Sequence, residues 1–144
     1  MTAQIAGTEF VLAALGGAVL ALPYVVYARR LRAPVRLFGI GLVVAAGIYV
    51  AFAVAGGTRG DLVTEVAGVV VFGMLAFLGI RHSAWLLALG WASHIGWDLL
   101  LHPADASSYA PWWYPAVCLG FDLVVAGAVV ARFQTGRRGL VFPP

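Results

Sequence analysis

Three ionisable residues recur at every fourth position in one apolar stretch of the chain, which runs from Ala84 to His102. A spacing of four places His94, Asp98 and His102 on one face of an α-helix. A histidine and a carboxylate so placed can exchange protons as general base and general acid, and they can also ligate a metal ion. A charge at the centre of a bilayer costs roughly 2.5–3.5 kcal/mol, so we expect this stripe to face the interior of a helix bundle.

Other polar and aromatic side chains interrupt the remaining apolar stretches. Two acids, Glu65 and Asp122, occur in otherwise apolar segments, and both could join the stripe. The candidate catalytic residues are the acids and the central histidine: Glu65, His94, Asp98 and Asp122. The candidate binding residues can stack on or hydrogen-bond to a substrate: Tyr49, Trp91, Trp97 and His102.

The composition indicates which elements must position these residues. Of 144 residues, 62% are hydrophobic and 10% are charged, and the mean hydropathy is +0.96. A soluble domain has roughly 45–50% apolar and about 25% charged residues. Five apolar runs approach the length of about 20 residues that crosses a bilayer. We therefore predict an all-α membrane helix bundle, a single domain over residues 1–144, with spans near 10–28, 35–55, 62–80, 84–101 and 113–132.

The arginines indicate the orientation of the spans. Eight of the nine arginines fall on one side of this topology, and only Arg59 falls on the other. The positive-inside rule then places the amino terminus outside and the carboxyl terminus in the cytoplasm, as expected for a multi-pass protein of the plasma membrane. No positive charge precedes the first apolar run, so we expect that run to be retained rather than cleaved as a signal peptide. Arginines at span ends do not indicate a nucleic-acid partner.

This topology places the candidate residues at similar depths. At 1.5 Å per residue, Asp98 lies about 6 Å, His94 about 12 Å and Asp122 about 14 Å below the outer surface. Glu65 is expected about one turn below that surface, after a connection over residues 56–61. We therefore predict one shared site that opens toward the extracytoplasmic side.

Two kinds of chemistry fit such a site. His94 and His102 are separated by about 12 Å along a helix, so one ion cannot bind all three residues of the stripe. A divalent ion such as zinc, iron or manganese could instead bind His94 with Asp98, or Asp98 with His102, together with Glu65 or Asp122. Without a metal, the acids and the histidine could divide the roles of general acid and general base. The sequence contains no phosphate loop or dinucleotide fingerprint, so no nucleotide cofactor is expected.

The same residues also have structural explanations. Asp98 and a neighbouring histidine could form a hydrogen-bonded pair that locks two helices, and Glu65 could extend into the lipid headgroups. The other candidates are compatible with ordinary packing in the core: Tyr49, Trp91, Trp97 and the single cysteine, Cys118.

The pattern Gly90-Trp91, His94, Trp97-Asp98 and His102, followed by Cys118 and Asp122, resembles one found in a family of small bacterial integral membrane proteins of unknown function. The match covers the last two predicted helices best. The family carries a second histidine beside the position of His102, where this chain has Leu101. The resemblance implies a common site, but it implies neither a reaction nor a histidine-rich metal centre.

Three functions are compatible with these features. The leading hypothesis is a membrane-embedded enzyme that uses acid–base or metal-assisted chemistry on a hydrophobic substrate, a lipid or an isoprenoid dissolved in the bilayer. The alternatives are a small proton- or ion-coupled permease and a structural subunit of a membrane complex, and a homo-oligomer is compatible with each. The enzyme ranks first because the polar residues gather on one side of the membrane, whereas a carrier needs polar access from both sides.

Overall fold

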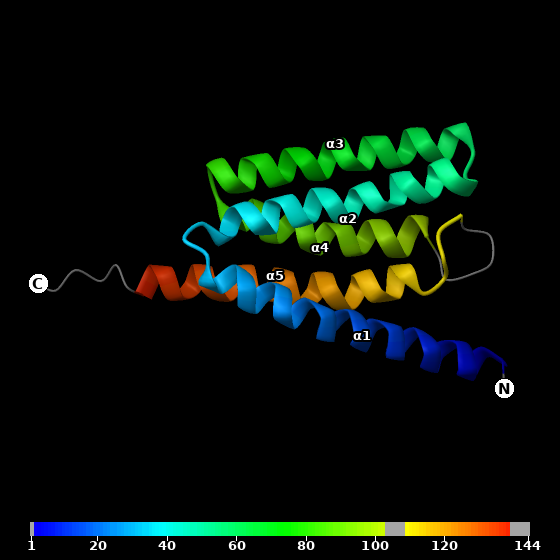
Figure 1. Ribbon diagram of the computed structural model, residues 1–144, viewed down its shortest axis with the longest axis horizontal. Coiled ribbons are helices and arrows are strands. Elements are labelled where there is room, and N and C mark those ends of the chain that lie inside the picture. Colours follow the sequence, from blue (N-terminus) through cyan, green and yellow to red (C-terminus); the bar gives the residue numbers. More distant parts are fainter. Residues whose placement is uncertain (1, 103–108, 139–144) are drawn as a thin grey trace, which may run out of the picture.

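The computed structural model describes residues 2–102 and 109–138, which form an all-α bundle of five helices (Figure 1). Each helix contains a stretch long and apolar enough to cross a membrane, so the predicted fold class and a multi-pass membrane protein are confirmed. The helices are α1 (Thr2–Arg30), α2 (Pro34–Gly56), α3 (Arg59–Arg81), α4 (Ala84–Leu101) and α5 (Tyr114–Arg138).

The third helix begins earlier than the sequence analysis predicted. Only Gly57 and Thr58 separate α2 from α3, so the predicted connection over residues 56–61 is wrong. The cause is a capping box, in which the Thr58 hydroxyl accepts from the Asp61 amide at 3.2 Å and the Asp61 carboxylate accepts from the Thr58 amide at 2.7 Å. Glu65 therefore lies six residues into α3, about 9 Å from its start, rather than one turn.

The helices pack as two pairs that are joined by α4. The first pair is α1 with α5 and the second is α2 with α3, and α4 contacts α5, α3 and α2 (Figure 1). A helix in this central position has neighbouring helices along one face and leaves the other face exposed. The stripe on α4 therefore has protein on several sides.

The two ends of the bundle differ in charge. One end, which we call the arginine end, holds the end of α1, the start of α2, the end of α3, the start of α4 and the end of α5 (Figure 1). Six of the arginines with described side chains lie in or beside these segments: Arg29, Arg30, Arg32, Arg36, Arg81 and Arg132. The opposite end holds the start of α1, the α2–α3 connection, the start of α3 with Arg59, and the start of α5.

The core near the arginine end is apolar. Leu42, Leu87, Val125 and Trp91 belong to one cluster of buried hydrophobic residues, and Trp91 is fully buried. The indole nitrogen of Trp91 donates a hydrogen bond to the Phe38 carbonyl at 3.1 Å, which joins α4 to α2. The buried Trp91 side chain therefore helps to exclude water from the middle of the bundle.

Glycine permits the close approach of α1 to α5. A Cβ added at Gly17 would overlap the backbone of Val117, and one added at Gly120 would overlap the backbone of Ala14. Small residues at such crossings bring helix backbones together where lipid offers no hydrophobic drive to pack.

We predict that Gly17→Leu lowers the stability of the bundle by roughly 1–3 kcal/mol, because the side chain must push α1 away from α5. Gly16→Leu is the matched control, since Gly16 is exposed and nothing lies within 4 Å of its added Cβ. Thermal unfolding in detergent measures both variants. Equal melting temperatures for the two would contradict the close contact between the helices.

Candidate functional site

The stripe on α4 is buried along its whole length. Leu87, Trp91, His94 and Asp98 are fully buried, and His102 is 1% exposed. On the outward face, Leu89 and Leu100 are 55% and 81% exposed. The predicted periodicity therefore separates the polar stripe from the face available to lipid.

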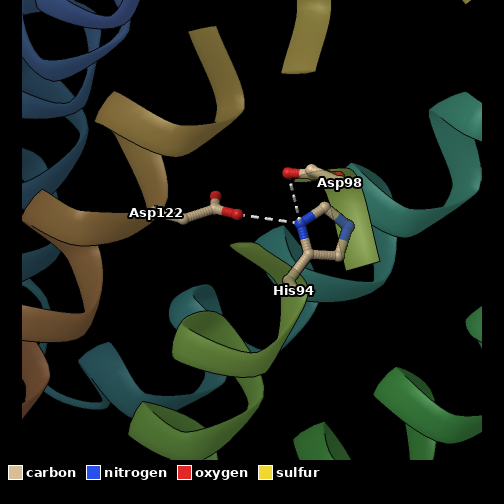
Figure 2. Close-up of side chains that lie close together, drawn as sticks. All are labelled: His94, Asp98 and Asp122. Atoms are coloured by element: carbon tan, nitrogen blue, oxygen red, sulfur yellow. Dashed lines mark hydrogen bonds and ion pairs between the residues drawn. The ribbon is translucent and has the colours of Figure 1, made fainter. Parts of the chain in front are cut away.

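His94 lies between two carboxylates from different helices. Its Nδ1 atom is 2.8 Å from an oxygen of Asp122 on α5 and 3.4 Å from an oxygen of Asp98, one turn further along α4. Figure 2 shows the imidazole ring with one carboxylate on each side of this nitrogen. We call His94, Asp98 and Asp122 the histidine–aspartate cluster. It brings three ionisable groups together in a place with almost no solvent contact.

Several polar atoms in and beside this cluster make no hydrogen bond. Among the described residues, four buried side-chain atoms make no hydrogen bond: Nε2 of His94, both oxygens of Asp98 and the hydroxyl of Tyr49. Each such atom costs about 1–3 kcal/mol, and native structures contain few of them. Four of them in one region therefore mark a place where stability is given up, as binding sites often require.

A second polar cluster surrounds Glu65 on α3. One of its oxygens accepts from Tyr109 at 2.6 Å and lies 3.1 Å from Nε2 of His102, and the other accepts from the Trp97 indole at 3.2 Å. We call these four residues the glutamate cluster. Glu65 is 1% exposed, so it points into the bundle and does not extend into headgroups.

Tyr109 supplies the shortest of these hydrogen bonds from outside the helices. Burial and the hydrogen bond to Glu65 raise the pKa of the Tyr109 phenol above its ordinary value. The phenol therefore keeps its proton at neutral pH and acts as the donor.

Tyr49 on α2 joins the two clusters. Its ring stacks on His102 with centroids 4.0 Å apart, and it lies 6.2 Å from the ring of His94. Tyr114 meets the Tyr49 ring in an edge-to-face contact, with the ring centroids 5.2 Å apart. The single site expected from the sequence is therefore two adjacent clusters that meet at this tyrosine.

The structure changes the expected partners of several candidate residues. His102 lies against Glu65 rather than against Asp98, and Trp91 packs in the apolar core rather than in either cluster. Tyr114 packs inward on Tyr49, whereas its neighbours Trp112 and Trp113 are 43% and 45% exposed. Helix rotation decides these contacts, and it depends on packing between helices.

Two contributing residues were missed by the sequence analysis. Tyr109 follows His102 in a connection that must return to the start of α5, so its closeness to the stripe was a usable signal. Phe72 on α3 places its ring edge-on to His94 at 4.8 Å and to Trp97 at 5.7 Å. An aromatic residue within a continuous apolar run gives no comparable signal.

The histidine–aspartate cluster has a donor set that fits a metal ion. His94, Asp98 and Asp122 each offer one ligand atom, and these atoms all lie within 4.8 Å of one another. One nitrogen and two carboxylate oxygens suit zinc, iron or manganese. Asp122 completes this set, whereas His102, a metal candidate from the sequence, belongs to the glutamate cluster.

Comparison of the chain with protein-family models, with curated proteins and with solved structures finds no match. The resemblance to small bacterial membrane proteins therefore remains a prediction. The function has to be argued from the geometry of the two clusters.

We predict that Tyr109→Phe lowers stability by about 1–3 kcal/mol, because the buried Glu65 carboxylate loses a donor that it cannot replace with water. Tyr27→Phe is the control, since Tyr27 is 59% exposed. Thermal unfolding in detergent compares the two variants. A melting temperature unchanged by Tyr109→Phe would show that the Tyr109 hydroxyl does not hold Glu65.

Proposed function

We propose that this protein is a membrane-embedded enzyme in which His94, Asp98 and Asp122 perform acid–base or metal-assisted chemistry on a hydrophobic substrate dissolved in the bilayer. A lipid or an isoprenoid is the substrate class that such a bundle would meet. The observation that carries the proposal is the position of His94 Nδ1, between buried carboxylates of two helices.

In the metal-free form of the proposal, Asp122 orients the histidine. With the imidazole proton on Nδ1 and donated to Asp122, Nε2 carries a lone pair and can act as a base. Asp98 has no hydrogen-bond partner among the described residues, so its carboxyl group is available to give or take a proton. The three residues would then divide the roles of orienting group, base and acid.

In the metal-assisted form, the same three side chains hold the ion. Three protein ligands leave a coordination position open for water or substrate, as in catalytic rather than structural zinc sites. A bound metal would supply polarisation of a substrate oxygen or an activated water. The apolar and aromatic surroundings, including Phe72 and Tyr49, would keep bulk water out.

The distribution of polar groups favours an enzyme over a permease. Both clusters lie toward the end of the bundle opposite the arginines, and the buried core between them and the arginine end is formed by Trp91, Leu87 and other apolar residues. An ion path through the protein would need polar groups in that half as well. The glutamate cluster could instead carry protons between the histidine–aspartate cluster and one surface only.

We also propose that the protein lies in the plasma membrane with its amino terminus outside, so that both clusters are in the outer half. This orientation follows from the positive-inside rule and the eight arginines on one side.

Reporter fusions test the orientation. A fusion after the carboxyl terminus should report a cytoplasmic location, and a fusion inserted at Gly57 should report an extracytoplasmic one. The opposite pair of signals would reverse the orientation and place both clusters in the inner half.

Asp98→Asn tests the function. We expect this variant to lose any bound metal and to change the lipids that accumulate in membranes producing the protein, because the amide removes the charge of the carboxylate. Its melting temperature should hold or rise, since a buried carboxylate that makes no hydrogen bond is replaced by a neutral group. Metal analysis, lipid mass spectrometry and thermal unfolding are made on the same preparations.

Ser93→Ala is the matched control on the same helix, since the Ser93 hydroxyl only donates to the Gly90 carbonyl of its own helix. Metal lost with Asp98→Asn supports the metal-assisted form, and a lipid change without metal in the parent protein supports the metal-free form. A lowered melting temperature with metal and lipids unchanged would show that Asp98 only locks helices, and would refute the enzyme.

A further inference from the structure

The arginine end carries a hollow that the proposed chemistry does not use. It has a volume of about 760 Å³ and lies between the connection from α1 to α2, the start of α2 and the ends of α3 and α5. Four arginines are among the residues that line it, and apolar residues that include Ile40 and Phe77 line the rest. The lining arginines are Arg32, Arg36, Arg81 and Arg132.

The positive charge around this hollow is not balanced by acids of the same half. The chain has no acidic residue between positions 10 and 60, between positions 66 and 97, or after Asp122. The ion pairs among the described residues all involve histidines in the two buried clusters, and none includes Arg32, Arg36 or Arg81. The hollow is therefore a cationic surface with no aspartate or glutamate side chain in the same half of the bundle.

The residues that line the hollow beside the arginines are apolar. Ile40 is 59% exposed and Phe77 is 54% exposed, on neighbouring faces of α2 and α3. The Arg81 guanidinium lies over the Phe77 ring, 5.3 Å from its centroid. An amphiphile with an anionic head and a hydrocarbon tail would match both parts, the head on the arginines and the tail along the helices.

We propose that this hollow binds the phosphate headgroup of an anionic phospholipid. Guanidinium groups bind phosphate oxygens in pairs, and basic pockets between membrane helices are suited to lipid headgroups. The positive-inside rule accounts for arginines at helix ends, but it does not require four of them to line one hollow with apolar walls. The proposal does not depend on the enzyme, because the histidine–aspartate cluster lies beyond the apolar core.

Native mass spectrometry of the full chain in detergent, with added phosphatidylglycerol or phosphatidylcholine, tests the proposal. We expect phosphatidylglycerol to bind at least tenfold more tightly than phosphatidylcholine. The double variant Arg36→Gln/Arg81→Gln should weaken this binding by about thirtyfold, because each basic side chain near an anionic head contributes roughly a factor of five. Arg59→Gln is the control at the opposite end and should leave the affinity unchanged.

A second variant tests the hollow and keeps every arginine, since arginines at helix ends also direct membrane insertion. Ile40→Trp keeps every arginine and fills the hollow, so it should weaken phosphatidylglycerol binding. Val44→Trp, one turn along α2 and 55% exposed, lies outside the lining and should not. Equal binding of the two lipids, or unchanged binding in Ile40→Trp, would overturn the proposal. Displacement of the lipid by millimolar inorganic phosphate would also overturn it, because the site would then recognise a small anion.

Discussion

The contact between His94 and Asp122 is the interaction on which the arrangement of polar groups depends. It joins α4 to α5 through two side chains with almost no solvent contact, 2.8 Å apart. Breaking such a pair leaves a buried ionisable group alone, which costs far more than the pair returns. The same helix, α4, joins the two helix pairs, so this contact and the packing of α4 against α5, α3 and α2 together set its rotation and the places of Asp98 and His102.

The bundle is divided into a polar half and an apolar half, and the division limits what the protein can do. Trp91, fully buried and hydrogen-bonded to the Phe38 carbonyl, lies in the apolar half three residues from His94. In the part of the chain that the structure describes, the buried core of that half is apolar, so the chemistry we propose at His94 would exchange protons with the opposite end. The glutamate cluster lies between, and Tyr49 touches both clusters through its ring.

The two clusters differ in how many of their buried polar atoms make hydrogen bonds. Glu65 has three hydrogen-bonding partners, and its cluster ties α3, α4 and the segment at Tyr109 together. Asp98 has no hydrogen-bond partner among the described residues, although it is fully buried. A satisfied network stabilises a fold, whereas an unsatisfied one lowers stability unless it binds something. On this ground we propose a structural role for Glu65 and assign the proposed chemistry to His94, Asp98 and Asp122.

The sequence by itself determined the five spans, the arginine asymmetry and the buried stripe of α4, because hydropathy, span length and the helical repeat are local properties. The start of α3 is also determined by nearby residues, and the capping box between Thr58 and Asp61 would have predicted it. Only the tertiary structure decided that Asp122 pairs with His94, that Glu65 pairs with His102, and that Tyr109 closes over Glu65. Equal depth does not decide between these partners, because the rotation of each helix about its axis is set by packing against its neighbours, as at Gly17 and Gly120.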